Sequence, residues 1–205
     1  MSTLIEASGK AARGENRVRI LRAALDIIAD SGVDKVTHRA VAGLADVSPG
    51  TTTYHFDSRE ALVREAFALY ISDYEKALVE ALTSRPLKSR EDIIGFLAGT
   101  TTLAPEGAAL ASIEYEMILF AGRDQEMRMR VAAWARTLES WLSDPLERLG
   151  AVRPLEAART LVATCRGSEF EVMSRGQGLS REQFFGRIGG VLDSLLKATP
   201  VQVDN

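Results

Sequence analysis

Residues 37–56 read THRAVAGLADVSPGTTTYHF, and this stretch decides the expected fold. Thr37 is a residue type that caps helix N-termini, and Ser48 repeats this signal with a proline in the first helical position behind it. The pattern predicts two short helices, Thr37–Ala45 and Pro49–His55, joined by a tight turn. This is the helix-turn-helix arrangement, in which the second helix enters the DNA major groove with its N-terminus first.

Apolar residues recur with the period of an amphipathic helix on both sides of this stretch. Leu21, Leu25 and Ile28 predict a helix over residues 15–31, which Gly32 ends. Runs with the two-residue alternation of strands are missing, so the fold class is all-α with about nine helices. Further helices are expected at residues 58–82, Arg90–Thr101, Glu106–Ala121, Gln125–Leu149, Pro154–Ser174 and Ser180–Lys197, with disordered tails over residues 1–12 and 198–205.

The chain has 205 residues, 46% hydrophobic and 26% charged, which is typical of a folded globular protein. A single cysteine, Cys165, excludes an internal disulfide and a thiolate zinc site, and we interpret it as an inert core thiol. Two histidines, His38 and His55, are too few for a multi-histidine metal site, so no metal or other cofactor is expected. No apolar stretch approaches the roughly 20 residues of a membrane span, which predicts a soluble, cytoplasmic protein without a membrane partner.

Charge and side-chain chemistry single out the first quarter of the chain. Residues 10–64 carry nine basic and seven acidic side chains, whereas the rest of the chain carries 16 basic and 21 acidic ones. The second short helix is crowded with hydrogen-bonding groups from Ser48 to His55, although threonine is a poor helix former. Hydroxyl groups and threonine methyls are suited to phosphates, base edges and thymine methyls, which favours DNA as the partner.

The stretch from Ile20 to Phe67 resembles the TetR family of bacterial transcriptional regulators. The segments ILRAALDIIADSG, THRAVAGLADVS and PGTTTYHFDSREAL carry the resemblance over nearly fifty residues. It implies a helix-turn-helix DNA-binding domain over residues 13–60 and a C-terminal helical ligand-binding and dimerisation domain over residues 61–198, which the helix at 58–82 connects.

The resemblance also implies roles for single residues. Thr37 would cap the first motif helix and touch phosphate, and Arg59 would clamp the flanking phosphate. For the N-terminal arm with Lys10, Arg13 and Arg17 there are two alternatives. The arm tracks the phosphates or a minor groove of the DNA, or it makes no DNA contact. The expected DNA-binding residues are Thr37, Arg39, Ser48, Pro49, Gly50, Thr51, Thr53, Tyr54, His55 and Arg59.

Three positions depart from the family pattern. Asp46 stands where the turn usually has glycine, and aspartate tolerates the positive φ that such a turn requires. Thr52 replaces a buried leucine, and Thr53 replaces a tyrosine that contacts phosphate, a contact that Tyr54 is expected to take over. We further expect Val41, Leu44 and Val47 to pack the two short helices together.

The second half of the chain is expected to hold an effector and a dimer interface. Its apolar side chains are either core or, as the resemblance implies, the lining of a cavity with Glu114 at its edge. The expected pocket residues are Phe96, Leu110, Ile113, Glu114, Met117, Phe120, Trp134, Trp141 and Cys165. The resemblance also implies a dimer interface in which the last two helices of each subunit form a four-helix bundle. The residues expected there are Leu161, Val172, Phe184, Ile188, Val191, Leu192 and Leu195.

These observations predict a homodimeric transcriptional repressor that leaves a palindromic double-stranded operator when a small molecule binds its C-terminal domain. The alternatives are a DNA-binding regulator controlled by a protein partner, and an activator without a small-molecule pocket. An enzyme on a helical bundle is disfavoured, because neither histidine lies in the bundle and no Glu-x-x-His pair occurs.

Overall fold

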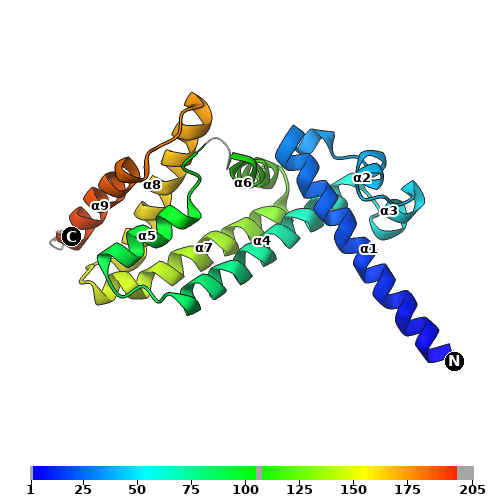
Figure 1. Cartoon of the computed structure of the whole chain (residues 1–205), viewed down its shortest axis with the longest axis horizontal. Coiled ribbons are helices and arrows are strands. Elements are labelled where there is room, and N and C mark those ends of the chain that lie inside the picture. Colours follow the sequence, from blue (N-terminus) through cyan, green and yellow to red (C-terminus); the bar gives the residue numbers. More distant parts are fainter. Residues whose placement is uncertain (1, 105–107, 198–205) are drawn as a thin grey trace. The chain divides into compact units, whose positions relative to one another are not determined.

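The computed structural model describes residues 2–104 and 108–197 of the chain. Within these residues it contains nine α-helices, one short 3₁₀ helix and no strand, which confirms the all-α prediction (Figure 1). No helix in this part is both long enough and apolar enough to cross a membrane. The helices are α1 Ser2–Ser31, η1 Val33–Lys35, α2 His38–Leu44, α3 Pro49–His55, α4 Arg59–Ser84, α5 Arg90–Thr100, α6 Ala108–Ala121, α7 Gln125–Arg148, α8 Pro154–Arg175 and α9 Arg181–Lys197.

The first helix is longer than expected. We predicted a helix from residue 15 and a disordered tail before it, but α1 begins at Ser2. No proline interrupts residues 2–31, and the good helix formers alanine, glutamate, lysine and arginine recur throughout, so the helical backbone continues to the N-terminal side. The predicted disorder of residues 198–205 lies outside the described residues.

The chain divides into two compact units that differ from the predicted domains. The first unit comprises the described residues up to Ala77 together with Ser112–Arg130, and the second comprises Leu78–Ala111 and the chain from Val131 onward. The long helix α4 runs from one unit into the other, as the connecting role expected for it requires. Residues 112–121 of α6 belong to the first unit.

The core of the first unit lies between α1, the two short helices and α4. The predicted stripe on α1 is buried, with Leu21 2%, Leu25 7% and Ile28 1% exposed, and α4 adds the fully buried Leu62 and Phe67. Figure 1 shows α2 and α3 beside the C-terminal half of α1. These contacts hold the two short helices on a rigid support.

Gly32 ends α1 as predicted. Its φ of +88° is a conformation that side chains rarely adopt, and its amide donates to the Ile28 carbonyl over 3.0 Å. A Cβ atom at this position would lie 3.0 Å from the Glu116 carboxylate. Glycine is therefore required by the backbone conformation, whereas the flexible end of the Glu116 side chain could move aside.

The core of the second unit is formed by one face each of α5, α7, α8 and α9. Helix α5 crosses α9 at Gly189, where an added Cβ would lie 2.5 Å from the Arg90 guanidinium. Arg90 makes a bidentate ion pair over this glycine, with Nε 2.6 Å and Nη2 3.1 Å from the two carboxylate oxygens of Asp193. The missing side chain of Gly189 therefore leaves room for the Arg90 guanidinium of the same chain.

The expected dimer interface is wrong for five of its seven residues, because these five are buried inside the single chain. Leu161, Val172, Phe184, Ile188 and Leu192 are each 0% exposed within the single chain, so they have no surface left to offer a partner. The periodicity correctly marked them as buried, but the elements that cover them belong to the same chain. The remaining two, Val191 and Leu195, are half-buried.

Candidate DNA-binding site

The two short helices begin at the predicted caps. The Thr37 hydroxyl accepts a hydrogen bond from the Ala40 amide over 3.1 Å, and the Ser48 hydroxyl accepts one from the Thr51 amide over 3.2 Å. Each hydroxyl satisfies one of the free N–H groups that every helix start leaves. The caps therefore fix where α2 and α3 begin and which side chains project from their first turns.

The turn between α2 and α3 depends on Asp46. Its φ is +50°, and it is the only described residue other than glycine with a positive φ. The prediction that aspartate takes over the glycine conformation here is confirmed. The Val47 amide donates to the Ala42 carbonyl over 3.0 Å and closes the turn.

Thr52 is buried, like the leucine that the family pattern has at this position, and its hydroxyl is hydrogen-bonded within the motif. It is 0% exposed, and its Oγ1 donates to the Pro49 carbonyl over 2.8 Å and lies 3.4 Å from the His38 carbonyl. The second contact reaches from α3 to the first residue of α2. A buried hydroxyl that has partners costs little, so the substitution preserves the packing of the motif.

The rest of α3 presents polar groups to solvent. Tyr54 is 69% exposed, and its ring stacks edge-on against the His55 imidazole with the centroids 5.3 Å apart. The Thr53 hydroxyl donates to the Gly50 carbonyl over 3.2 Å, which leaves its lone pairs and its methyl group free to contact a ligand. Of the ten predicted DNA-binding residues, Thr37, Arg39, Ser48, Pro49, Gly50, Thr53 and Tyr54 are exposed, and Thr51, His55 and Arg59 are half-buried.

One expectation about the motif is wrong. Leu44 was expected in its core but is 57% exposed, and Ala45 with 7% takes the buried position. The Thr51 hydroxyl lies 2.9 Å from the Ser48 hydroxyl and is hydrogen-bonded to it, so its contact with DNA stays a prediction.

The Arg59 guanidinium is engaged by partners within the chain, so its expected phosphate contact stays a prediction. Its Nε donates to the Val36 carbonyl over 2.8 Å and its Nη2 to the Val33 carbonyl over 2.5 Å. The guanidinium also lies 3.4 Å from Glu60 and 3.8 Å from Asp34. Arg59 therefore ties the start of α4 to the connection between α1 and α2, because its planar fork matches two carbonyls at once. No sequence signal marks these long-range partners.

Arg17 of the expected N-terminal arm is also engaged within the chain. Its guanidinium forms an ion pair with Glu65 at 3.0 Å and lies over the Phe56 ring at 5.5 Å. These contacts join α1 to α4 and to the residue that follows α3. Arg17 is thus part of the support of the motif.

A second group of contacts in the first unit joins α4 to α6 and to the start of α7. The Tyr70 hydroxyl donates to Glu114 over 2.8 Å, and Arg64 forms an ion pair with Asp124 at 2.8 Å. The Asp124 carboxylate also accepts a hydrogen bond from the Met127 amide, which is the main cause of its lowered pKa; the hydrogen bond from Arg64 lowers it further. Glu114, predicted as a pocket residue, therefore has a partner on the helix that connects the units.

The predicted pocket residues differ in exposure and lie in both units. Ile113, Met117, Trp134 and Cys165 are buried, whereas Leu110 is 63% exposed, which does not fit an enclosed cavity. Burial raises the pKa of the Cys165 thiol to about 11, as its interpretation as an inert core thiol requires. The half-buried members are Phe96, Glu114, Phe120 and Trp141, and Trp141 borders a groove in the second unit.

The geometry defines a helix-turn-helix protein whose second motif helix is capped, exposed and polar. Two family models match the chain: residues 20–66 match the bacterial regulatory proteins of the tetR family, and residues 88–198 match the tetracyclin repressor-like C-terminal domain. The chain belongs to the TetR family of bacterial transcriptional regulators. The expected family is thereby confirmed, and with it the N-terminal helix-turn-helix and the C-terminal helical domain.

Individual relatives agree with this assignment. The HTH-type transcriptional regulator UidR of Escherichia coli (strain K12) is 39% identical over 62 residues, a match that covers 30% of this chain and 30% of UidR. A transcriptional regulator from Rhodococcus sp. Rha1 shares the fold with a TM-score of 0.77 at 18% identity, covering 90% of this chain and 99% of that one. The multidrug binding protein EbrR, solved with imidazole, has a TM-score of 0.64 at 26% identity, covering 92% and 93% of the two chains.

Proposed function

We propose that this protein is a homodimeric repressor that binds a palindromic operator through α3 and leaves it when a small molecule binds the C-terminal domain. The observation that carries the proposal is the capped, solvent-exposed α3, whose polar side chains are held in place by the buried Thr52. In a dimer, two such helices would read half-sites one or more DNA turns apart, at multiples of about 34–36 Å.

The proposed division of labour on DNA follows from exposure. Arg39 and the hydroxyl of Tyr54 would contact phosphates, and Thr53 together with the backbone at Gly50 would approach base edges. Thr37, Ser48, Pro49, Thr51 and His55 would shape this surface or touch the flanking phosphates. Arg59 is assigned a supporting role instead of a phosphate contact, because its guanidinium donates to the Val33 and Val36 carbonyls.

Fluorescence anisotropy with an operator found by capture of genomic fragments tests this division. Arg39→Ala should reduce the slope of log affinity against log salt by about 0.9, the value for one lost phosphate contact. Tyr54→Phe should weaken binding about tenfold or more on every sequence, because a hydrogen bond to a charged phosphate contributes about 1.5–3 kcal/mol. The salt slope should not change, because the lost hydroxyl carries no charge. Arg136→Ala, which removes the same charge from an exposed site on α7, is the matched control. Equal salt slopes for all three variants would overturn the assignment.

The dimer interface is proposed on the faces of α8 and α9 that the chain leaves uncovered. Phe170 is 64% exposed, and Ala163 and Gly167 precede it on the same exposed stripe of α8. On α9, Gly186 and Gly190 are exposed and have no atom within 4 Å of an added Cβ, so a second helix has room to approach closely. The half-buried Val191 and Leu195 would extend this surface, and a two-fold axis would bring the same faces together.

Sedimentation equilibrium tests the interface. Phe170→Glu should convert the dimer to a monomer, because it would place a charge in an apolar contact. Leu119→Glu changes a side chain of similar exposure, 67%, on α6 and should leave the dimer intact. A dimer that survives Phe170→Glu, or dissociates with Leu119→Glu, would place the interface elsewhere.

The effector is proposed to act through α6. Of the relatives, EbrR has been solved with imidazole and with ethidium, which supports a small organic molecule as the effector. Within the first unit, α6 contacts α4 through Tyr70–Glu114 and the Phe67–Phe120 ring pair, and it reaches the end of α1 at Gly32. An effector that binds more tightly when α6 is in one position than in another would therefore shift the population of helix-turn-helix orientations.

Native mass spectrometry of the purified protein and of Tyr70→Phe tests this route. A retained small molecule that dissociates the wild type from its operator, and does so less in Tyr70→Phe, supports it. If Tyr70→Phe responds like the wild type, the Tyr70–Glu114 contact does not transmit the signal. Release that requires a protein partner would favour the alternative regulator without a small-molecule pocket.

A further inference from the structure

A groove of about 380 Å³ opens in the second unit between the end of α4, the connection to α5 and the C-terminal half of α7. It is lined by Leu82, Pro86, Leu87, Ser140, Trp141, Asp144, Pro145 and Arg148. This volume lies in the range of small-molecule sites. Its lining contains one of the nine predicted pocket residues, Trp141, so it is a different site from the predicted one.

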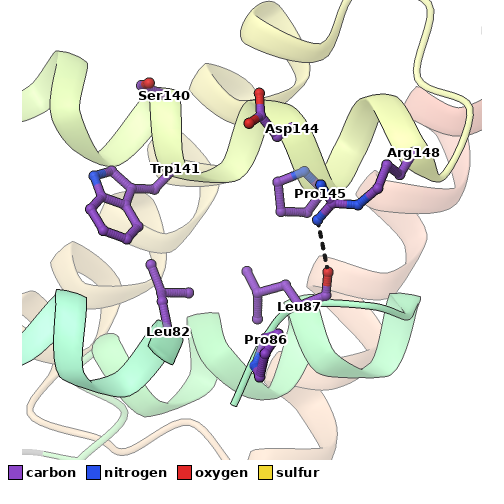
Figure 2. A pocket seen from close by; sticks show the side chains of 8 residues that line it. All are labelled: Leu82, Pro86, Leu87, Ser140, Trp141, Asp144, Pro145 and Arg148. Carbon is purple, nitrogen blue, oxygen red and sulfur yellow. Dashed lines mark hydrogen bonds between the residues drawn. The ribbon is translucent and has the colours of Figure 1, made fainter. Parts of the chain in front are cut away.

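Two apolar walls face each other across the groove. Figure 2 shows the Trp141 indole and the Pro145 ring on α7 turned toward Leu82 and Leu87. Leu87 and Pro145 are buried, whereas Trp141 and Leu82 are half-buried and keep part of their surface open to solvent. A flat ring system fits between such walls, because it can stack on the indole and displace water from the leucine side chains.

The charged groups of the groove differ in direction. The Arg148 side chain extends across the groove and its Nη2 donates to the Leu87 carbonyl over 3.3 Å, the dashed line in Figure 2. The Asp144 carboxylate is turned away from Leu82 and Leu87 in the same view. The guanidinium, with donors beyond Nη2, is thus the charged group that a ligand between the walls would meet.

We propose that this groove binds an aromatic monocarboxylate, with the ring between Trp141 and the two leucines and the carboxylate on Arg148. Arginine is suited to this role because its planar donors match the two oxygens of a carboxylate. The orientation of Arg148 selects an anion over a cation. The inference goes beyond the proposed regulation, because it assigns a ligand class to a particular groove. Binding at this groove can be measured without DNA, so its test does not depend on operator binding.

Fluorine NMR of the protein labelled with 5-fluorotryptophan tests the proposal. The chain has two tryptophans, so the buried Trp134 and the half-buried Trp141 give one signal each, which Trp141→Phe assigns. The probes are 2-naphthoate, the neutral 2-naphthamide and the cationic 2-naphthylmethylammonium. We expect 2-naphthoate to shift the Trp141 signal with saturation and the Trp134 signal to stay in place, with binding at least about fivefold tighter than that of the amide.

Two variants separate recognition from folding. Arg148→Gln should abolish the preference for naphthoate over naphthamide, and Arg148→Lys should retain part of it because the charge remains. Arg136→Gln, another arginine on α7, is the matched control, and an unchanged Trp134 signal in the free variants verifies that the second unit is folded. Equal binding of the three probes, tighter binding of the cation, or a shift of Trp134 in place of Trp141 would each overturn the proposal.

Discussion

Replacing Arg59 by alanine distinguishes a supporting role from a phosphate contact. The change removes two charge-assisted hydrogen bonds, to the Val36 and Val33 carbonyls, from a side chain that is 31% exposed. Such bonds contribute about 1.5–3 kcal/mol each when sheltered, and partial exposure reduces this value. We therefore expect Arg59→Ala to lower the free energy of unfolding by about 2 kcal/mol in total, which corresponds to a decrease in Tm of about 4–8 °C.

The measurement is thermal unfolding together with operator binding over a range of salt concentrations. Arg39→Ala removes the same charge from an exposed side chain and should leave the Tm within about 2 °C while it lowers the salt slope. Arg59→Ala should do the opposite. Arg59→Lys keeps the charge but replaces the planar fork, so it should recover little of the lost stability. A normal Tm combined with a salt slope lowered by about 0.9 in Arg59→Ala would refute this reasoning and restore the phosphate clamp.

Two other substitutions and the reactivity of one thiol have outcomes that follow from the structure. Gly50→Ala should fold normally, because the added Cβ has only the Ser48 hydroxyl nearby at 3.7 Å; a stable variant with full operator affinity would show that the Gly50 backbone does not approach DNA. The Cys165 thiol, with a pKa of about 11 and 7% exposure, should react with a thiol reagent at pH 8 only on unfolding, so rapid reaction of the native protein would contradict its burial. The pKa of Asp124 is lowered in the folded state, so its contribution to stability is present above the ordinary value of about 4 and is lost as the pH falls through the folded value. Asp124→Asn should therefore be less stable than the wild type at pH 7, with a difference that shrinks in acid. A difference independent of pH would show that the charge of Asp124 does not contribute to stability.

The local structure of the motif was predictable because its causes lie within a few residues. A capping hydroxyl bonds to an amide three residues away, as in Thr37–Ala40 and Ser48–Thr51. The positive φ of Asp46 was expected from the glycine that the family pattern has in this turn, and the aspartate side chain tolerates it. The apolar period likewise marked Phe184, Ile188 and Leu192 as buried. The start of α1 was missed because a weakly amphipathic stretch carries no boundary signal.

The tertiary structure alone decided which partner each side chain meets. Arg59 bonds to carbonyls 23 and 26 residues away, and Arg90 pairs with an aspartate 103 residues away. An apolar period states that a face is covered but not by what, so helices of the same chain and of a second copy produce the same pattern. Residue types and their spacing were enough to predict most of the helices, the caps of α2 and α3, and the polar surface of α3. Which arginines remain free to meet phosphate, and which faces of α8 and α9 remain free to meet a partner, depended on long-range packing, because those contacts form only once the helices are assembled.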